Sequence, residues 1–333
     1  MTASFAVLGS GAWGTAVAAI LAQNPQHRVA LWSARVENAA VWHASRENAR
    51  LLPGVAIPKS VLLTTDIRAA IEDADLLVAA IPTAYLRTTL TRIAGAIAKD
   101  TPLLSLVKGL ENHTFDRPTQ IALETLGQRS VAVLSGPSHA EEVARGLPTT
   151  LVAASDDLTL ARWVQERFST DRLRIYTNTD LVGVELAGAL KNVIGIAAGI
   201  SDGLALGDNC KSALLTRGLS EMARFGVALG ADAPTFWGLA GMGDLITTCI
   251  SRHGRNRAVG ERLAKGEKLA DIQASTSAVA EGVFTARSVH EKSQATGIPM
   301  PISTEVYRIL YEAKDPRVGV NDLMVRELRS EHW

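Results

Sequence analysis

A glycine pattern at the start of the chain constrains its fold more than any other feature. Residues 5–8 form an apolar run, Phe-Ala-Val-Leu, and residues 9–14 read Gly-Ser-Gly-Ala-Trp-Gly before a small apolar stretch. The spacing G-x-G-x-x-G between a strand and a helix is typical of dinucleotide-binding loops. Gly9 permits the tight turn, Gly11 lets the backbone approach a pyrophosphate, and Gly14 lets strand and helix pack closely. Because the N–H groups of the following helix would face the phosphates, we expect a dinucleotide cofactor.

The end of the next apolar run indicates which cofactor is used. The predicted strand 29–32 is followed by Ser33, Ala34 and Arg35. NAD sites usually place an acidic residue here for the ribose hydroxyl, and this chain has none. Arg35 could instead pair with a 2′-phosphate, although a solvated loop charge is the alternative. Since Ser33 does not repel NADH, the prediction is NADP or NAD, with NADPH preferred.

The charge balance argues against some classes of partner. The 333 residues contain 34 basic and 34 acidic side chains, so the formal net charge is zero. A nucleic acid or an anionic membrane therefore has no global electrostatic support, and anions must be bound by locally placed Lys and Arg. The two cysteines, Cys210 and Cys249, have neither metal-ligand nor disulfide-framework spacing. These features, with no signal-peptide pattern at the start, lead us to expect a cytoplasmic protein without a metal.

The first half of the chain alternates short apolar runs with helical patterns. This rhythm predicts a Rossmann-like, doubly wound α/β sheet, and runs this apolar are typical of parallel strands covered on both faces. Ligands in such folds bind beyond the carboxyl ends of the strands. Helices are expected at Ile67–Glu72, Leu86–Ala98 and Leu158–Phe168. After the first two, strands are expected at Val61–Thr64, Leu76–Ala80, Leu103–Leu106, Val131–Ser135, Thr150–Ala153 and Arg174–Thr177.

The pattern becomes wholly helical near Asp180, which could cap the first long helix. We therefore expect a dinucleotide-binding domain over 1–180 and an all-helical substrate and catalytic domain over 181–333. The apolar stretch 186–200 is too short to span a bilayer and is interpreted as a buried core helix. The expected helices are Leu181–Ile200, Lys211–Leu229, Arg255–Ala264, Gly282–Ala295, Ser303–Ala313 and Val320–Leu328. Helix stops are expected at Gly230, Gly266 and Gly297, and close helix approach at Gly188, Gly195 and Gly199.

Two polar segments follow predicted strands. Lys108 comes directly after the run ending at Val107, where its side chain would point toward bound ligand, although the spacing alone favours an ordinary loop lysine. Residues 135–140, Ser-Gly-Pro-Ser-His-Ala, could approach a phosphate or a nicotinamide ring closely. His139 is a possible general base, but the two glutamates that follow favour a histidine at a helix start.

Lys191 is the sharpest catalytic candidate. It lies mid-helix among small and apolar residues, where a lysine is costly unless it has partners or reaches solvent. Burial and neighbouring cations would depress its pKa, which suits a group that donates and then accepts a proton near neutrality. A lysine that merely extends to solvent is the alternative.

A further polar segment spans residues 241–257. Asp244 and Thr248 are four residues apart and would share one face of a helix, whereas Cys249 has no obvious base and is interpreted as structural. Arg255 and Asn256 stand at a probable helix start, which suits phosphate binding. A solvated turn is the alternative.

Taken together, these segments resemble the family of NAD(P)-dependent glycerol-3-phosphate dehydrogenases over nearly the whole chain. Several of them are long and specific to that family, and they occur in the family's order. The matching segments are Gly9–Gly14, Ser105–Glu111, Leu134–Glu141, Glu185–Gly195, Gly238–Cys249, Arg255–Arg257 and Ala280–Gly282.

The resemblance implies an oxidoreductase that interconverts dihydroxyacetone phosphate and sn-glycerol 3-phosphate for phospholipid synthesis, as a cytoplasmic homodimer. It implies that Lys191 exchanges the proton and that Lys108 binds substrate and cofactor. Asp244 and Thr248 would hold substrate hydroxyls or orient Lys191. The implied substrate contacts also include Gly136, Ser138, Arg255 and Asn256, and the implied cofactor contacts include Ser10, Trp13, Arg35, Ala140, Arg255, Val279 and Glu281.

One departure and two competing functions accompany this resemblance. Bacterial members usually carry Ser before the Arg-Asn pair, whereas this chain has Gly254, so one hydroxyl contact to phosphate is lost. A 6-phosphogluconate-type dehydrogenase would share the two-domain plan, but the Lys191-Asn192 and Arg255-Asn256 pairs argue against it. A cofactor-binding sensor without turnover would need no proton donor. A small phosphorylated substrate, and neither nucleic acid nor stable membrane insertion, is therefore expected.

Overall fold

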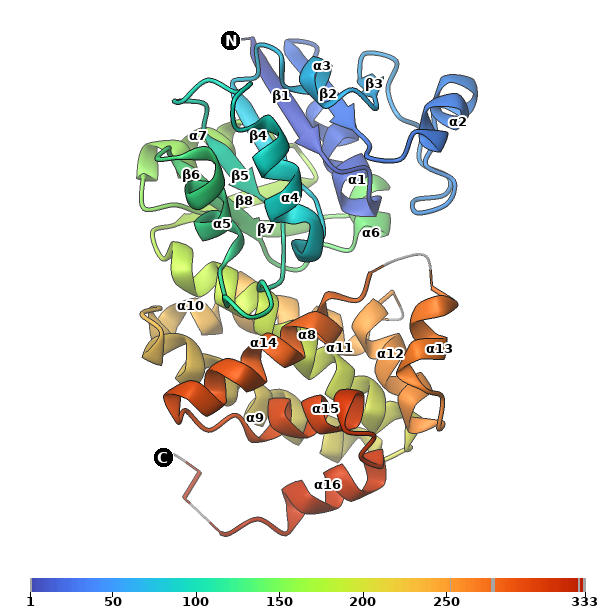
Figure 1. Cartoon of the computed structure of the whole chain (residues 1–333), viewed down its shortest axis with the longest axis vertical. Helices are drawn as coiled ribbons and strands as arrows, with labels where there is room; N and C mark the ends of the chain where they lie inside the picture. The colour runs from blue at the N-terminus through green and yellow to red at the C-terminus, as the bar shows by residue number, and fades with distance from the viewer. Residues whose placement is uncertain (1, 252, 277–278, 329, 332–333) are drawn as a thin grey trace.

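The computed structural model describes residues 2–251, 253–276, 279–328 and 330–331. Figure 1 shows a sheet with flanking helices in one half of the molecule and a packed group of helices in the other. All the described strands belong to one eight-stranded sheet, in the order β3-β2-β1-β4-β5-β6-β7-β8. The strands are β1 Ala3–Leu8, β2 His27–Trp32, β3 Leu62–Thr64, β4 Leu76–Ala79, β5 Leu103–Ser105, β6 Val131–Ser135, β7 Thr149–Ala154 and β8 Leu173–Asn178.

Helices cover both faces of this sheet, which confirms the predicted doubly wound α/β fold. Buried residues of α3, α4 and α5 pack on one face, in a core that continues into the helical half of the chain. Buried residues of α1 and α7 pack on the other face. The helices of this half are α1 Ala12–Leu21, α2 Glu37–Ser45, α3 Ile67–Ile71, α4 Thr83–Ile93, α5 Pro118–Leu126, α6 Ala140–Ala144 and α7 Leu158–Phe168.

The expectation of an all-parallel sheet is wrong for its last two strands. β6 pairs with β7 antiparallel, and β8 runs parallel to β7, so both oppose the first six strands. A parallel return after β6 would need a crossover, usually a helix across the sheet face. The short α6 instead packs beside α1, and the chain turns back along the sheet edge. Apolar runs encode burial but not strand direction, so the sequence pattern did not reveal this.

The second half of the described chain is helical, as predicted, and α8 is its centre (Figure 1). The Asp180 carboxylate caps α8 by accepting the Gly183 N–H at 2.7 Å. With 23 residues, α8 is long and apolar enough to cross a bilayer, but 89% of its most apolar window is buried inside the protein. The helices are α8 Leu181–Gly203, α9 Gly207–Ala228, α10 Ala233–Trp237, a π-helical turn Leu239–Gly243, α11 Asp244–Ile250, α12 Arg255–Ala264, α13 Leu269–Ala274, α14 Glu281–Thr296, α15 Pro301–Tyr311 and α16 Pro316–Met324.

Glycines along α8 allow the neighbouring helices to come close. A Cβ on Gly199 would lie 1.9 Å from the Arg257 carbonyl oxygen, and a Cβ on Gly195 would lie 2.7 Å from Thr248 Cγ2. Gly188 faces the sheet instead, 3.0 Å from Ser135 Oγ when a Cβ is added. The predicted close approach of helices is therefore confirmed for Gly195 and Gly199. The predicted stops at Gly230, Gly266 and Gly297 are also confirmed, because all three adopt positive φ beyond helix ends.

Several helices were missed or misplaced by the sequence pattern. The helix expected from Leu86 begins three residues earlier, and the one expected over 320–328 occupies 316–324. In both cases Pro at or before the first turn marks the true start, because proline suits that position and not a helix interior. The helices α2, α5, α10 and α13 are short or weakly patterned and were not predicted, and only the start of α6, at His139, was.

Candidate active site

The glycine loop joins β1 to α1 with the geometry that its sequence predicts. Gly9 has φ +120°, and a Cβ there would lie 2.4 Å from the Ala80 carbonyl oxygen. A Cβ on Gly14 would lie 2.0 Å from the Gly9 carbonyl oxygen, so strand and helix meet without room for a side chain. A Cβ on Gly11, in contrast, would meet no atom of the described residues within 4 Å. The loop therefore leaves its middle glycine open at the N-terminus of α1, which fits a bound pyrophosphate.

Polar side chains extend this loop toward the end of β2. Ser10 Oγ donates a hydrogen bond to Ser33 Oγ at 2.9 Å, and Asn38 Nδ2 also donates to Ser33 Oγ at 2.8 Å. Arg35 is half exposed and lies 3.9 Å from Glu37, a loose surface pair. In the first turn of α1, Trp13 Nε1 is buried without a hydrogen-bond partner among the described residues. Arg35 thus stands free enough to meet an anion beyond β2.

Lys191 lies in the middle of α8 and is held by two polar side chains of α11. Its Nζ donates to Asp244 Oδ1 at 2.7 Å and to Thr248 Oγ1 at 2.5 Å. All three side chains are buried; Lys191 is only 7% exposed. The predicted helical face of Asp244 and Thr248 is confirmed, and the buried lysine has the partners that burial demands.

Lys108 reaches the same carboxylate from the carboxyl end of β5. Its Nζ donates to Asp244 Oδ2 at 2.7 Å. It also donates to the Gly136 carbonyl at 2.9 Å and to Ser138 Oγ at 3.1 Å, both in the loop after β6. Two ammonium groups from different halves of the chain therefore share one buried carboxylate. This arrangement concentrates positive charge where a ligand oxygen could take up negative charge.

Burial and mutual charge set the protonation of this cluster. Burial lowers the pKa of Lys191 to about 8; Asp244 opposes that shift, and the charge of Lys108 adds to it. Burial alone would raise the pKa of Asp244, but Lys108 and Lys191 together hold it below its usual range. Asp244 is therefore ionised, and Lys191 is an ammonium that can release its proton near neutral pH.

Hydrogen bonds between two asparagine side chains, an amide relay, connect α8 to the start of α12. Asn192 Nδ2 donates to the Lys108 carbonyl at 2.8 Å, and Asn192 Oδ1 accepts from Asn256 Nδ2 at 2.8 Å. Asn256 Oδ1 in turn accepts the Gly282 N–H at 3.0 Å. Asn192 was not singled out as a site residue. The sequence feature that could have indicated Asn192 is a side-chain amide next to a lysine inside an apolar helix.

Arg255 and Glu281 lie near this relay at the starts of α12 and α14. Arg255 is exposed, and its Nη1 donates to the Val279 carbonyl at 3.1 Å. Glu281 accepts the Thr83 N–H of α4 at 2.9 Å, and burial raises its pKa. A Cβ on Gly109 would lie 2.6 Å from Glu281 Oε2. Glu281 thus caps a helix of the sheet half from the helical half, a contact that sequence reasoning missed.

The structure also places four further residues that the sequence analysis named. His139 precedes the first residue of α6, as its alternative interpretation predicted, and Ala140 is that buried first residue. Burial raises the pKa of Cys249 to about 12, which fits its interpretation as structural. A Cβ on Gly254 would lie 2.9 Å from the Thr248 carbonyl oxygen. A serine at position 254 would therefore require this turn to shift.

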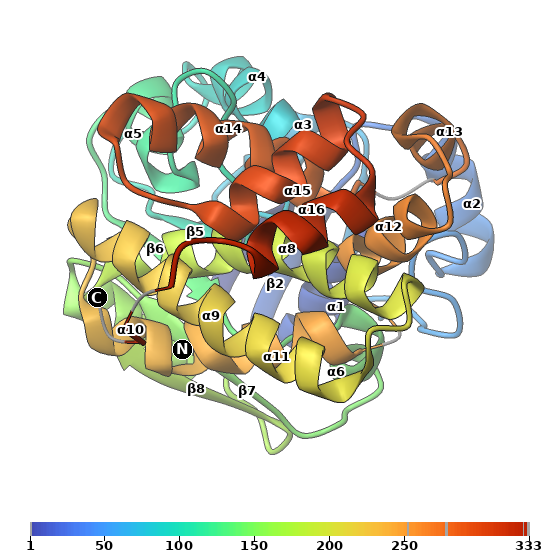
Figure 2. The same ribbon diagram turned by 90° about the horizontal axis from the view of Figure 1, so that it is seen from below.

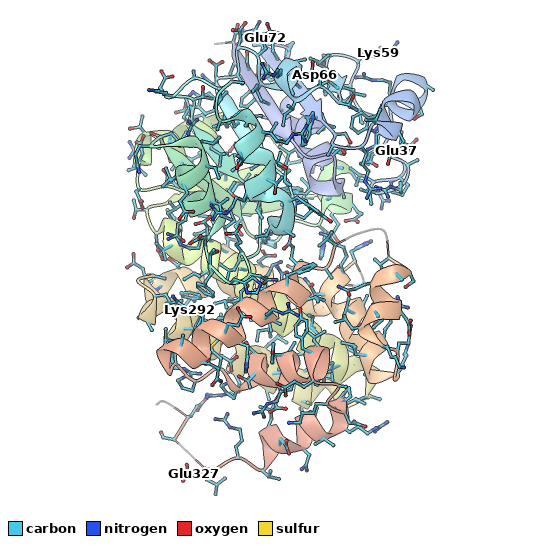
Figure 3. The ribbon with its side chains drawn as sticks, in the orientation of Figure 1. Glu37, Lys59, Asp66, Glu72, Lys292 and Glu327 are labelled. Carbon is cyan, nitrogen blue, oxygen red and sulfur yellow. The ribbon has the colours of Figure 1, made fainter. Side chains whose placement is uncertain are left out.

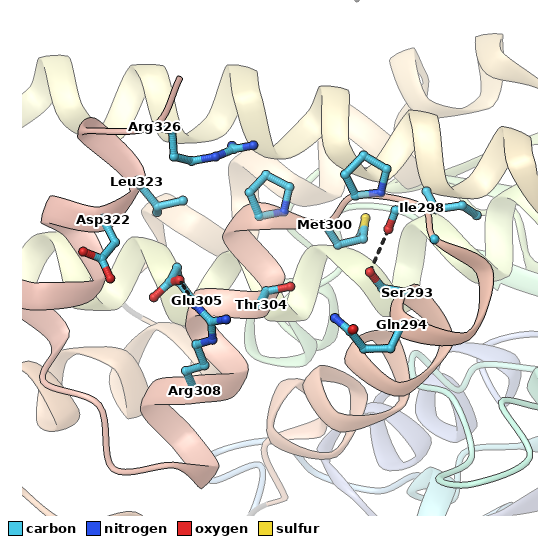
Figure 4. Close-up of a pocket in the computed structure, with 13 residues that line it drawn as sticks. Ser293, Gln294, Ile298, Met300, Thr304, Glu305, Arg308, Asp322, Leu323 and Arg326 are labelled. Atoms are coloured by element: carbon cyan, nitrogen blue, oxygen red, sulfur yellow. Dashed lines mark hydrogen bonds and ion pairs between the residues drawn. The ribbon is translucent and has the colours of Figure 1, made fainter. Parts of the chain in front are cut away.

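Two cavities lie outside the lysine cluster. One of about 240 Å³ lies between α12, α13 and α14 and includes Arg255 and Val279 in its wall. The other, of about 500 Å³, lies among α14, α15 and α16 at the far end of the helical half, where Glu305 pairs with Arg308 (Figure 4).

Charged side chains of both signs, such as Lys59 and Glu72, project from the molecule's edges (Figure 3).

Comparisons with known proteins agree on one family. The profile described as NAD-dependent glycerol-3-phosphate dehydrogenase N-terminus matches residues 4–161, and the corresponding C-terminus profile matches 180–321. A Chlorobium phaeobacteroides protein named glycerol-3-phosphate dehydrogenase [NAD(P)+] is 46% identical over 331 residues, covering 98% of this chain and 99% of that one. Its counterpart from Geobacillus thermodenitrificans is 45% identical over 328 residues, covering 98% and 95%.

A solved structure shows the same likeness in three dimensions. The crystal structure of glycerol-3-phosphate dehydrogenase from Coxiella burnetii superposes with a TM-score of 0.94 at 37% identity. The superposition covers 98% of this chain and 99% of that chain. The resemblance inferred from the motifs is confirmed.

Proposed function

The chain belongs to the NAD-dependent glycerol-3-phosphate dehydrogenase family, and on this premise we propose that it interconverts dihydroxyacetone phosphate and sn-glycerol 3-phosphate with NAD(P)H. One observation carries the proposal for this chain. Lys191 and Lys108 share the buried Asp244 carboxylate beside the loop after β6. A proton donor and a second cation are thus fixed together, as reduction of a ketone to an alcohol requires.

Lys191 exchanges the proton in this proposal. When bound, the nicotinamide supplies the hydride. Lys191 Nζ, with a pKa near 8, donates a proton to the ketone oxygen and accepts one in the reverse direction. Lys108 stabilises the negative charge that develops on that oxygen. Asp244 and Thr248 hold Lys191 in place or bind substrate hydroxyls, so that the ammonium need not reorganise during reaction.

The phosphate of the substrate is held away from the reacting carbon. Arg255 and Asn256, at the N-terminus of α12, supply charge and amide donors for it, and the helix end adds its own N–H groups. Gly136 and Ser138 contact the substrate from the loop after β6. Binding energy from this remote group can then orient the carbonyl for reaction.

The cofactor is held by the turn between β1 and α1 and by residues at the domain junction. The open face of Gly11 fits the pyrophosphate. Arg35 would pair with the 2′-phosphate that NADPH carries and NADH lacks, which favours NADPH. The proposed contacts are Gly9, Ser10, Gly11, Trp13, Gly14, Arg35, Lys108, Ala140, Arg255, Val279 and Glu281.

The remaining proposals concern organisation and cellular role. We place the division between a cofactor domain, 1–180, and a catalytic domain, 181–333, at Asp180, because it caps α8 after the last described strand. By family resemblance, the enzyme acts as a cytoplasmic homodimer that feeds phospholipid synthesis. The apolar α8 supports a role as a core helix rather than a membrane anchor, since it is largely buried.

Turnover with a matched pair of ketones tests the proposed reaction. The full chain is mixed with NADPH or NADH, and loss of nicotinamide absorbance is followed with dihydroxyacetone phosphate. Unphosphorylated dihydroxyacetone and 3-oxo acids are the controls. Oxidation that is far faster with the phosphorylated ketone than with either control supports the proposal. Turnover with a 3-oxo acid would favour a 6-phosphogluconate-type enzyme, and tight NADPH binding without turnover would favour a sensor.

A further inference from the structure

Two histidines from different halves of the chain meet beside the lysine cluster. His139 precedes α6 in the sheet half, and His253 lies in the turn between α11 and α12 of the helical half. Their ring centroids are 5.8 Å apart, with the rings tilted by 53°. Both views place α6 next to the α11–α12 region, across the junction of the two halves (Figures 1 and 2). The proposed mechanism uses neither ring.

One nitrogen of this pair lacks a partner. His139 Nε2 is buried and has no hydrogen-bond partner among the residues that the structure describes. A buried ring nitrogen left unpaired costs stability, and such groups in native proteins usually serve a ligand or a water. The position of His139 therefore indicates a group that is satisfied when something binds at the junction.

The neighbours of the pair are the segments that bind anions in the proposed function. His139 directly follows Ser138, whose Oγ accepts from Lys108 Nζ at 3.1 Å. His253 stands two residues before Arg255, at the approach to the α12 N-terminus. Gly254, between His253 and Arg255 in the sequence, leaves no room for a side chain without a shift of the turn. The two rings therefore lie beside the residues that bind the substrate in the proposed function.

Burial, together with the charge of Lys191, favours the neutral form of the His139 ring. Lys191 of α8 and Asp244 of α11 act on it from the helical half, and Glu141 and Glu142 act from its own helix. Burial lowers the pKa of His139, and the charge of Lys191 lowers it further, while the three carboxylates oppose that shift. A neutral imidazole carries one N–H, so with the proton on Nε2 it donates a single hydrogen bond to an anion.

We propose that His139 and His253 bind the phosphate of the substrate from the two sides of the domain junction. This inference rests on the proposed function and adds two specificity-determining residues to it. Because each ring belongs to a different half of the chain, one phosphate that contacts both also ties the halves together. The pair therefore discriminates phosphorylated from unphosphorylated ketones rather than assisting the transfer of hydride.

Two substitutions test the pair. His139→Phe keeps a ring of similar size but removes the unpaired nitrogen, and His253→Phe likewise keeps a ring and removes both ring nitrogens. His113→Gln is the matched control, since His113 is 78% exposed and lies outside the site. For each variant, kcat and KM are measured with dihydroxyacetone phosphate, kcat/KM with dihydroxyacetone, and Tm without ligand.

The expected result separates binding from folding. Both variants should raise KM for the phosphorylated ketone by about 3–10-fold, the loss of one hydrogen bond to an anion, with kcat within about twofold. Their kcat/KM for dihydroxyacetone and the control's constants should not change. The Tm of His139→Phe should equal or exceed that of the wild type, because an unsatisfied buried nitrogen has been removed.

Other outcomes overturn the inference. An unchanged KM in both variants, or an equal loss with both ketones, shows that the pair does not contact phosphate. A fall in the Tm of His139→Phe with an unaltered KM assigns the ring to folding. A readout that does not depend on turnover separates this inference from the proposed function. Inorganic phosphate should raise the Tm of the wild type more than that of His253→Phe. If the wild type does not reduce dihydroxyacetone phosphate, the proposed function fails. The Tm measurement with inorganic phosphate would still show whether the two histidines bind phosphate.

Discussion

Lys191 and Asp244 form a buried ion pair with 2.7 Å between Nζ and Oδ1, although 53 residues separate them in the chain. Removing both ions from water is costly, and the pair offsets that cost only because further hydrogen bonds satisfy each partner. Lys108 and Thr248 provide those bonds. The carboxylate therefore controls the charge of the proton donor and joins it to the second cation.

Substitution of Asp244 by Asn tests that control. The Asp244→Asn variant would leave the buried Lys191 and the partly buried Lys108 facing a neutral amide, so the pKa of Lys191 should fall further. We expect kcat for ketone reduction to decrease by about 10–10²-fold at neutral pH. Steady-state kinetics measure the loss, and cofactor binding by nicotinamide fluorescence is the control. A kcat close to that of the wild type would show that Asp244 does not set the state of Lys191.

The pH dependence of the two directions should be opposite. Ketone reduction requires Lys191 as the ammonium, so its kcat should fall as pH rises through about 8, the pKa to which burial lowers this group. Oxidation of glycerol 3-phosphate requires the free amine, so its kcat should rise over the same interval. Profiles in both directions check this. If kcat rose with pH in both directions, or fell with pH in both directions, Lys191 would be excluded as the titrating group.

Two glycines of the same loop should respond differently to alanine. Gly14→Ala places a Cβ 2.0 Å from the Gly9 carbonyl oxygen, so strand and helix must separate, which should cost about 1–3 kcal/mol of stability. Gly11→Ala meets no described atom within 4 Å and should leave Tm unchanged. It should nevertheless weaken NADPH binding by roughly tenfold, since the methyl group would occupy the pyrophosphate position. Thermal unfolding and cofactor titration distinguish the two, and normal NADPH affinity in Gly11→Ala would remove the pyrophosphate from this turn.

Arg35 should decide between the two cofactors. It is half exposed and only loosely paired with Glu37, so its removal should not disturb the fold. We expect Arg35→Ala to lower kcat/KM for NADPH by about 10–100-fold, the loss of a charge-assisted contact to phosphate, with little effect on NADH. Parallel assays with both cofactors measure the ratio. Equal losses would mean that Arg35 does not contact the 2′-phosphate.

Much of the fold could be predicted because local patterns carry it. The glycine loop, the short apolar strands and the glycine stops at Gly230 and Gly297 each depend on neighbouring residues alone. The direction of β7 and β8 depends on how α6 packs beside α1, which no local pattern records. Proline-marked helix starts were present in the sequence but were outweighed by the hydrophobic period.

The site divides in the same way. Lys191 could be found because a charge in an apolar helix is conspicuous, and Asp244 and Thr248 because of their helical spacing. That Lys108 shares the Asp244 carboxylate is a contact across 136 residues and required the fold. The cap that Glu281 places on α4 spans 198 residues and left no sequence signal beyond the family resemblance.

The most direct test of the account is the turnover of Lys191→Ala. Lysine at this position is the only proton donor that the proposed mechanism uses, so kcat for dihydroxyacetone phosphate should fall by about 10²–10⁴-fold. NADPH affinity and Tm should be reported for the same preparation, with Lys59→Ala as a surface-lysine control. A folded Lys191→Ala enzyme that binds NADPH and has lost turnover is the predicted result. A folded variant that retains near-normal kcat would contradict the role of Lys191 and the mechanism built on it.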